Sequence, residues 1–261
     1  EVSGKQDLYI TGHADLRAPN GEGGSFLLDP GSILVYEDSG AMTPPFPGAN
    51  QVGNSFINNQ LTLGNFTLDT SGSVDTPGFP GITPQPWDIT VDGDITWNSP
   101  YSLTLNADNN NNINAQITNF GLGSLELSAA GNNNIDKAIS LGGGGLKLIA
   151  GGVNYINADI SLAPGGSIDA TGGSGIATFS SGGSSIIDAQ FNANTINMVS
   201  GGAVFNGNTT TNNLNQTGGY LLGSGALTVN GTYNWSGGNN DRTNNTTVGA
   251  TGQLLITGNA S

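Results

Sequence analysis

Two carboxylates stand two residues apart in the stretch VDGDI, at Asp92 and Asp94. If this stretch were a β-strand, both side chains would project from one face and lie about 7 Å apart. Inverting glycosidases use a similar separation to admit a water between an acid and a base. Aspartates on either side of Gly93 are also typical of a tight turn, which is the interpretation we favour. The pair leaves a carbohydrate-active β-helix enzyme, either a polysaccharide lyase or a glycosidase, as the alternative function.

The other residues with catalytic chemistry are scattered along the chain. The lone His13 lies beside Asp15 in a TGHAD turn, with no serine or cysteine indicated as its partner. A β-helix lyase would gather basic residues on one face, and the five basic residues here are far apart: Lys5, Arg17, Lys137, Lys147 and Arg242. We therefore predict no catalytic residue and a protein that is not an enzyme.

Metal and cofactor chemistry also has little support. The chain contains no cysteine, so disulfides and thiolate metal sites are excluded. The G-G-x-G-x-D signature of calcium-binding coil repeats does not occur. Oxygen ligands in YEDSG or DGD could hold one calcium ion adventitiously. We predict no metal site and no cofactor.

The net charge limits the partners. The 261 residues carry 19 acidic and 5 basic side chains, a formal charge of -14. Nucleic-acid binding needs a basic surface, and docking on anionic lipid needs clustered Lys or Arg. No apolar run approaches the length of a membrane-spanning helix. We predict no nucleic-acid partner and no insertion into a membrane.

An internal repeat organises the middle of the chain. Three series of apolar residues share one period of 21 or 22 positions. The series are Leu103, Leu125, Leu146 and Ile168; Ile113, Ile135 and Ile156; and Ile95, Ile117, Ile139 and Ile160. Such a short unit cannot bury a core alone, so the units must stack.

Within each unit the apolar residues alternate with polar ones, as in Leu103, Leu105 and Ala107. Alternation of this kind indicates half-buried strands, and the glycine and asparagine clusters would break a helix. The sequence therefore predicts an all-β, right-handed parallel β-helix with 21–22 residues and three short strands per coil. We expect residues 1–261 to form one continuous segment of a longer protein, with about twelve coils and a length of about 55 Å.

Polar residues recur with the same period. Asparagine and glycine suit the corners of the coil, and Asn111, Asn133 and Asn154 can form a ladder of stacked amides. Outward residues should form a charged column (Glu126, Lys147 and Asp169) and a hydroxyl column (Thr96, Thr118, Ser140 and Ser161). Lys137 occupies the slot held by Ala115 and Ala158 in neighbouring units, so we expect that slot to lie at a corner.

Two proline-rich stretches, 37–53 and 75–86, are predicted to be loops outside the coil. With the residue that follows the second stretch, they supply the binding candidates Phe46, Phe79 and Trp87, aromatic rings that could stack on sugars or pack back onto the coil. Between them, NNQLTLGNFTLDTSG is interpreted as two strands. The coils are expected to be regular from about residue 87 to 172 and looser thereafter, with no helical cap at either end.

The order of several phrases resembles a known family. GEGGSFLLDPGSILV is followed by NNQLTLGNFTL and then by WDITVDGDITWNSPYSLTLNADNNNNINAQIT. This series resembles the filamentous-haemagglutinin-type exoproteins that Gram-negative bacteria secrete by the two-partner pathway. The resemblance covers about residues 1–172 and carries over no defined binding residue.

That resemblance implies a secreted β-helix fibre on the bacterial cell surface, exported by an outer-membrane transporter partner. We therefore expect an adhesin or stalk segment used in attachment, aggregation or biofilm formation. Its receptor would be an unidentified glycan or protein on a host or bacterial surface.

Overall fold

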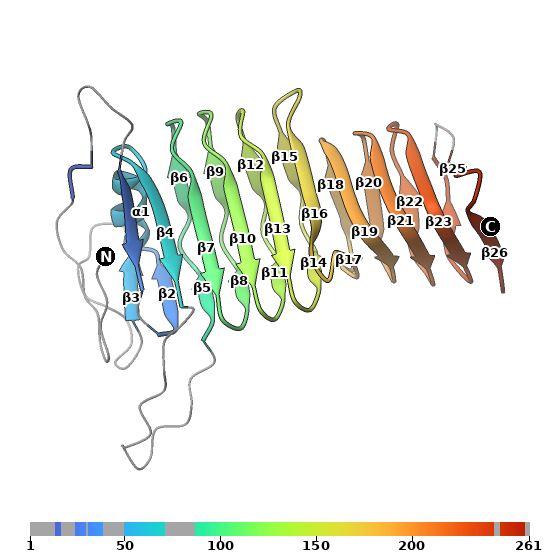
Figure 1. Ribbon diagram of the computed structural model, residues 1–261, viewed down its shortest axis with the longest axis horizontal. Helices are drawn as coiled ribbons and strands as arrows, with labels where there is room; N and C mark the ends of the chain where they lie inside the picture. The colour runs from blue at the N-terminus through green and yellow to red at the C-terminus, as the bar shows by residue number, and fades with distance from the viewer. Residues whose placement is uncertain are drawn as a thin grey trace, which may run out of the picture.

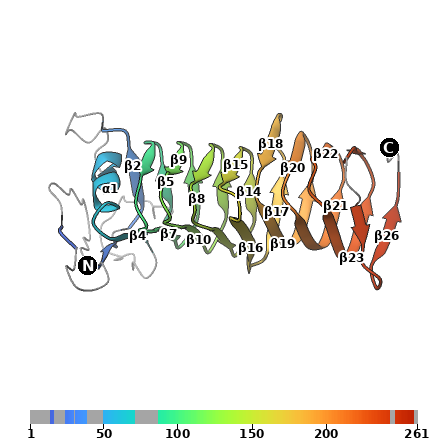
Figure 2. The same cartoon turned by 90° about the horizontal axis from the view of Figure 1, so that it is seen from above.

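A computed structural model describes residues 14–16, 24–29, 31–38, 50–70, 87–242 and 246–258. The described residues form an elongated β-solenoid of about nine turns (Figure 1). Every strand pairing is parallel, and the strands stack coil upon coil along one axis (Figure 2). The predicted all-β solenoid is therefore confirmed, with about nine coils in place of twelve. The right-handed sense stays a prediction, favoured by the usual hand of crossovers between parallel strands.

Three columns of paired strands make the three faces of the coil. The first face contains β1 (Ser25–Leu28), β4 (Asn65–Asp69), β7 (Leu103–Ala107), β10 (Leu125–Ala129), β13 (Leu146–Ala150), β16 (Ser167–Gly173), the first halves of β19 (Gln190–Met198), β21 (Thr209–Gln216) and β23 (Leu227–Trp235), and β25 (Thr246–Val248).

The second face contains β3 (Asn50–Gly53), β2 (Ile33–Tyr36), β5 (Ile89–Val91), β8 (Asn111–Ile113), β11 (Asn133–Ile135), β14 (Asn154–Ile156), β17 (Ile176–Phe179), the second halves of β19, β21 and β23, and β26 (Gln253–Ile256). The third face contains β6 (Ile95–Trp97), β9 (Ile117–Asn119), β12 (Ile139–Leu141), β15 (Ile160–Leu162), β18 (Ser184–Ile187), β20 (Gly202–Phe205), β22 (Tyr220–Leu222) and β24 (Asn239–Asn240).

The predicted apolar columns form the interior. Leu103, Leu125, Leu146 and Ile168 are direct register partners on the first face. The series from Ile113 to Ile156 and the series from Ile95 to Ile160 are likewise in register on the second and third faces. All of these side chains are at most 1% exposed. One hydrophobic core therefore runs along the solenoid axis.

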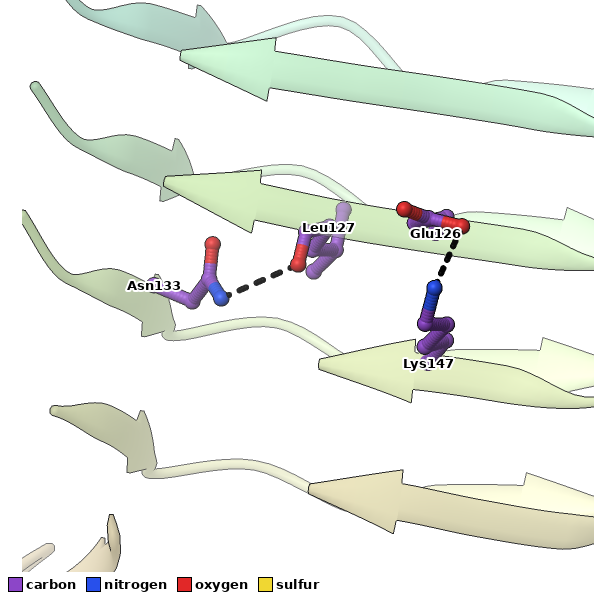
Figure 3. Close-up of polar contacts among 4 residues, drawn as sticks. All are labelled: Glu126, Leu127, Asn133 and Lys147. Carbon is purple, nitrogen blue, oxygen red and sulfur yellow. Dashed lines mark hydrogen bonds and ion pairs between the residues drawn. The ribbon is translucent and has the colours of Figure 1, made fainter. Parts of the chain in front are cut away.

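A ladder of buried amides runs beside this core. The Asn111 Nδ2 donates to Asn133 Oδ1 at 2.8 Å, and Asn133 Nδ2 donates to Asn154 Oδ1 at 2.7 Å. Asn133 Nδ2 also reaches the backbone carbonyl of Leu127, at 3.2 Å (Figure 3), and that of Ile149, at 2.9 Å. Each amide thus links its own coil to the next one and adds hydrogen bonds to buried backbone carbonyls.

Side chains also form hydrogen bonds between successive coils at the corners on the surface. The backbone N–H of Asn110 donates to Asp88 Oδ1, that of Asn132 to Asn110 Oδ1, and that of Val153 to Asn132 Oδ1, at 2.8–2.9 Å. The chain bends at these corners, so the N–H groups there take a side-chain oxygen from the preceding coil as their acceptor. The abundance of asparagine is therefore corner chemistry, as predicted.

The N-terminal region departs from the predicted pattern. Residues 50–53 of the expected 37–53 loop are strand β3, which pairs with β2. The stretch NNQLTLGNFTLDTSG, predicted as two strands, begins inside helix α1 (Asn54–Gln60), so the first of the two strands is wrong and the second is β4. Residues 39–49 and 75–86 lie outside the described residues. The helix forms because Phe56, Ile57 and Gln60 share one buried face, with Phe56 packed against Phe26 and Phe66.

The helix covers the edge of β6, the first strand of the third face, so the expectation that neither end has a helical cap is wrong for this face (Figure 1). Asn54 Nδ2 donates to the carbonyl of Asp94 at 2.8 Å, and the backbone N–H of Thr96 donates to Asn58 Oδ1 at 2.8 Å. Ser99 Oγ also donates to the carbonyl of Leu61. Side chains of the α1 region thus replace a neighbouring strand and protect the sheet edge from further pairing.

Beyond residue 172 the spacing first loosens, as expected, and then shortens. Ile168 and Phe191 are partners 23 residues apart on the first face, and Ile160 and Ile187 are 27 apart on the third. The register partners Phe191, Thr209, Leu227 and Thr246 recur after 18, 18 and 19 residues. In the earlier coils residues 108–110 form a corner between β7 and β8, whereas β19 runs continuously through the equivalent corner. Loss of that corner accounts for the shorter period and joins two of the three strands of each coil.

The internal amide ladder gives the first prediction. Replacing Asn133 with leucine keeps the side-chain volume but removes the acceptor of Asn111 Nδ2, the donor to Asn154 Oδ1 and two hydrogen bonds to backbone carbonyls. We expect the free energy of unfolding, from the urea midpoint, to fall by about 3 kcal/mol. Asn134→Leu, at the outward neighbour in the same strand, is the matched control and should cost less than about 1 kcal/mol. Equal losses for the two variants would contradict the ladder's role.

The helical cap gives the second prediction. Asn58→Ala removes the acceptor of the Thr96 amide, so hydrogen exchange at that amide should accelerate about tenfold. Asn59→Ala, at the exposed position next to it in α1, controls for the loss of an asparagine from this short helix. An unchanged exchange rate in Asn58→Ala would show that the edge of β6 is protected in another way.

Candidate functional site

The residues first considered for catalysis line a shallow hollow on the surface of the solenoid. Its walls are Asp92, Asp94, Asn114, Ala115, Gln116 and Lys137. They come from three successive coils, at the corner where the second face turns into the third. The hollow is open to solvent and places carboxylates, amides and one ammonium group close together.

Asp92 and Asp94 lie in the turn between β5 and β6 and not on a strand. The backbone N–H groups of Asp92 and Gly93 both donate to the carbonyl of Val35 in the preceding coil, at 2.8 and 3.1 Å. A Cβ atom on Gly93 would lie 2.6 Å from the backbone of Tyr36, so only glycine permits this close approach. The turn interpretation of VDGDI is confirmed.

Both carboxylates accept hydrogen bonds from the next coil. Asn114 Nδ2 donates to Asp92 Oδ1 and the backbone N–H of Gln116 donates to Asp94 Oδ1, each at 2.9 Å. The pattern recurs two coils further along, where Asn157 Nδ2 donates to Asp136 Oδ1 at 2.8 Å. Alternating aspartate and asparagine at this corner therefore has a structural explanation that needs no substrate.

Lys137 is exposed at the same corner, between β11 and β12. This placement confirms that its slot is a corner from which the ammonium group reaches water. The lysine lines the hollow from a coil two steps beyond that of Asp92 and Asp94. The hollow can therefore accept a polar group by hydrogen bonds, but its carboxylates are occupied in stacking.

The predicted charged column is present on the first face. Lys147 is the register partner of both Glu126 and Asp169, and its Nζ lies 3.4 Å from Glu126 Oε2 (Figure 3). Hydrogen bonds from the side chain and backbone of Thr171, more than the charge of Lys147, lower the pKa of Asp169. Because these groups are largely exposed, the column adds little to stability. The predicted hydroxyl column is also in register.

The aromatic binding candidates are not brought together. Phe46 and Phe79, like His13, lie outside the residues that the structure describes. Trp87 is half-buried at the corner leading into β5. Its carbonyl accepts hydrogen bonds from the backbone of Asn109 and from the hydroxyl of Thr70, at 3.1 and 2.9 Å. The structure thus assigns the backbone of Trp87 a corner role, and binding by its ring stays a prediction.

Metal ligands do not converge in the described part of the chain, where no group of three or more His, Asp or Glu side chains could hold an ion. Within the same residues, no helix is long and apolar enough to cross a membrane. Sequence reasoning missed the outward apolar residues of β18, β20 and β22. The signals were the adjacent isoleucines in SSII and the run YLL, which interrupt the alternation of apolar and polar residues.

Comparisons with known proteins found no matching family model, no similar curated protein and no similar solved structure. The resemblance to filamentous-haemagglutinin-type exoproteins therefore rests on the sequence phrases alone.

The hollow gives the third prediction. Asp94→Asn keeps the oxygen that accepts from Gln116 and should change the free energy of unfolding by less than about 0.5 kcal/mol, whereas Asp94→Ala should cost about 1 kcal/mol. The wild-type chain should release no reducing sugar from a panel of polysaccharides. Sugar release that is lost in Asp94→Asn, with stability unchanged, would instead assign the carboxylate a catalytic role.

Proposed function

We propose that this chain is a rigid segment of a secreted bacterial surface protein, acting as an adhesin or as the stalk that carries one. The observation that supports this proposal is the uninterrupted stacking of about nine coils on one core. At the strand spacing, nine coils span about 43 Å. Such a body provides reach and a long repetitive surface.

Stiffness follows from the direction of the hydrogen bonds. In a parallel solenoid the backbone bonds run along the axis on every face, so bending the rod strains many of them together. Side-chain ladders at the corners add further bonds in the same direction. A spacer that must hold a binding surface away from a cell benefits from this arrangement.

The sequence phrases support the bacterial surface as the location. LLDP followed by the DITV, ITW and SLTL phrases resembles exoproteins that reach the surface through an outer-membrane transporter. In this proposal the transporter is the export partner, and a glycan or protein on another cell is the receptor. The proline-rich stretches with Phe46 and Phe79 are the binding segments we favour, because binding groups often lie on loops carried by a rigid scaffold.

The fourth prediction tests adhesion. Fluorescent beads coated with the purified chain should attach to host or bacterial cells, and the same chain should bind selected spots on a glycan array. Phe46→Ala and Phe79→Ala should each reduce attachment several-fold, because an aromatic face that stacks on a sugar or protein is lost. Trp235→Ala, a change at a half-buried ring of the second face, is the aromatic control and should leave attachment unchanged.

The outcomes separate the roles. No attachment by a chain with a native circular dichroism spectrum would remove the adhesin role and leave the stalk. Cleavage of a polysaccharide by the wild-type chain would contradict both. Single-residue changes are preferable to deleting residues 37–53, because that deletion would remove strand β3 and with it the base of the α1 cap.

A further inference from the structure

The third face carries an outward apolar column near its C-terminal end. Ile186, Val204 and Leu222 are register partners on β18, β20 and β22, and their side chains point away from the core. Ile186 is 37% exposed, and Tyr220, which neighbours Leu222 on the same outer side of β22, is 53% exposed. We call these four residues the apolar strip.

The strip has no counterpart in the earlier coils of this face. There the outward column consists of hydroxyl side chains, from Thr96 to Ser161. The inward residues of β18, β20 and β22 are also buried, among them Ile187, Phe205 and Leu221. Parallel strands that are apolar on both sides normally belong to sheets covered on both faces, most often by helices.

Carboxylates stand at both ends of the strip. Asp159 accepts a hydrogen bond from the backbone N–H of Ile186 at 2.8 Å, which fixes one end. At the other end Asp241 directly follows Asn240, the register partner of Leu221, and its N–H donates to the Leu221 carbonyl at 2.9 Å. Both aspartates are exposed. Four coil steps separate them, or about 19 Å.

The basic side chain that follows Asp241 is turned toward the interior. Arg242 Nη1 donates to the Leu222 carbonyl at 3.0 Å, Nη2 donates to the Gly225 carbonyl, and the guanidinium lies 5.7 Å from the centre of the Phe205 ring. Burial lowers the pKa of Arg242. The guanidinium thus serves the turn and the core beneath the strip, while the carboxylates face outward.

We propose that the apolar strip is a docking surface for an amphipathic helix of a partner protein, with Lys or Arg at both ends of its apolar face. A helix that reaches from Asp159 to Asp241 needs about 13 residues at about 1.5 Å per residue. Its apolar residues would cover Ile186, Val204, Leu222 and Tyr220, and its basic ends would meet the two aspartates.

A second copy of the chain fits this surface less well. Each copy has a formal charge of -14, so two copies repel one another. A face-to-face pair would also bring the aspartates of one strip close to those of the other. The inference depends on the solenoid and not on the adhesin role, so the cell-attachment assay and the following experiment can fail independently.

The fifth prediction uses a synthetic fluorescent peptide of about 15 residues, with leucines at helical spacing and lysines at both ends. Fluorescence anisotropy should report binding to the full chain. Val204→Lys should weaken binding at least about tenfold, because it removes apolar contact and adds a like charge to the complex. Ser140→Lys, an outward change in the hydroxyl column of the same face, is the matched control and should leave binding unchanged.

Two further comparisons test the charge argument. A peptide with glutamates in place of the terminal lysines should bind at least about tenfold more weakly, and Asp241→Asn should reduce binding and its salt dependence. No binding of the lysine peptide, equal binding of the two peptides, or equal loss in Val204→Lys and Ser140→Lys would overturn the proposal. A dimer seen by light scattering and abolished by Val204→Lys would assign the strip to a second copy and also overturn it.

Discussion

Parallel, in-register stacking is the constraint on which the rest of this structure depends. Each side chain lies one strand spacing, about 4.8 Å, from its equivalent in the next coil, so any favourable or unfavourable contact is repeated along the axis. Leucine over leucine builds a core, and asparagine over asparagine builds a ladder because one amide can both donate and accept. Like charges would be repeated as well, and the chain avoids this by placing Lys147 between Glu126 and Asp169.

Corners impose a second requirement, and the composition follows from it. Where the backbone turns, its N–H groups donate to oxygen atoms of aspartate, asparagine or serine in the preceding coil, as at Asn110, Asn132 and Ser124. Much of the acidity is thus part of the scaffold, and Asp92 and Asp94 belong to it. The outward side chains on the faces are not required to accept hydrogen bonds from the backbone at corners. Binding is therefore to be sought on loops and faces rather than in the corner hollow.

Parallel, in-register stacking also explains features of the ends and of the outer faces of the solenoid. A strand at the end of a stack has unpaired backbone groups, and α1 protects β6 with the side chains of Asn54 and Asn58. An outward column of apolar side chains lacks the favourable contacts that hydroxyl groups make with water. Such a column is useful only if another surface covers it. The change from hydroxyl groups to Ile186, Val204 and Leu222 on one face thus distinguishes two regions of the rod.

The sequence by itself determined the stacked coils, the apolar columns, the amide ladder, the charged column and the corner position of Lys137. These features are readable because register partners share one period, and a period is a property of the chain. Only the tertiary structure decided that residues 54–60 are helical, since that helix depends on Phe26, Phe66 and the edge of β6, which are distant in sequence. It also decided that β19 is one continuous strand, because its two halves pair with two separate strands of the preceding coil, β16 and β17.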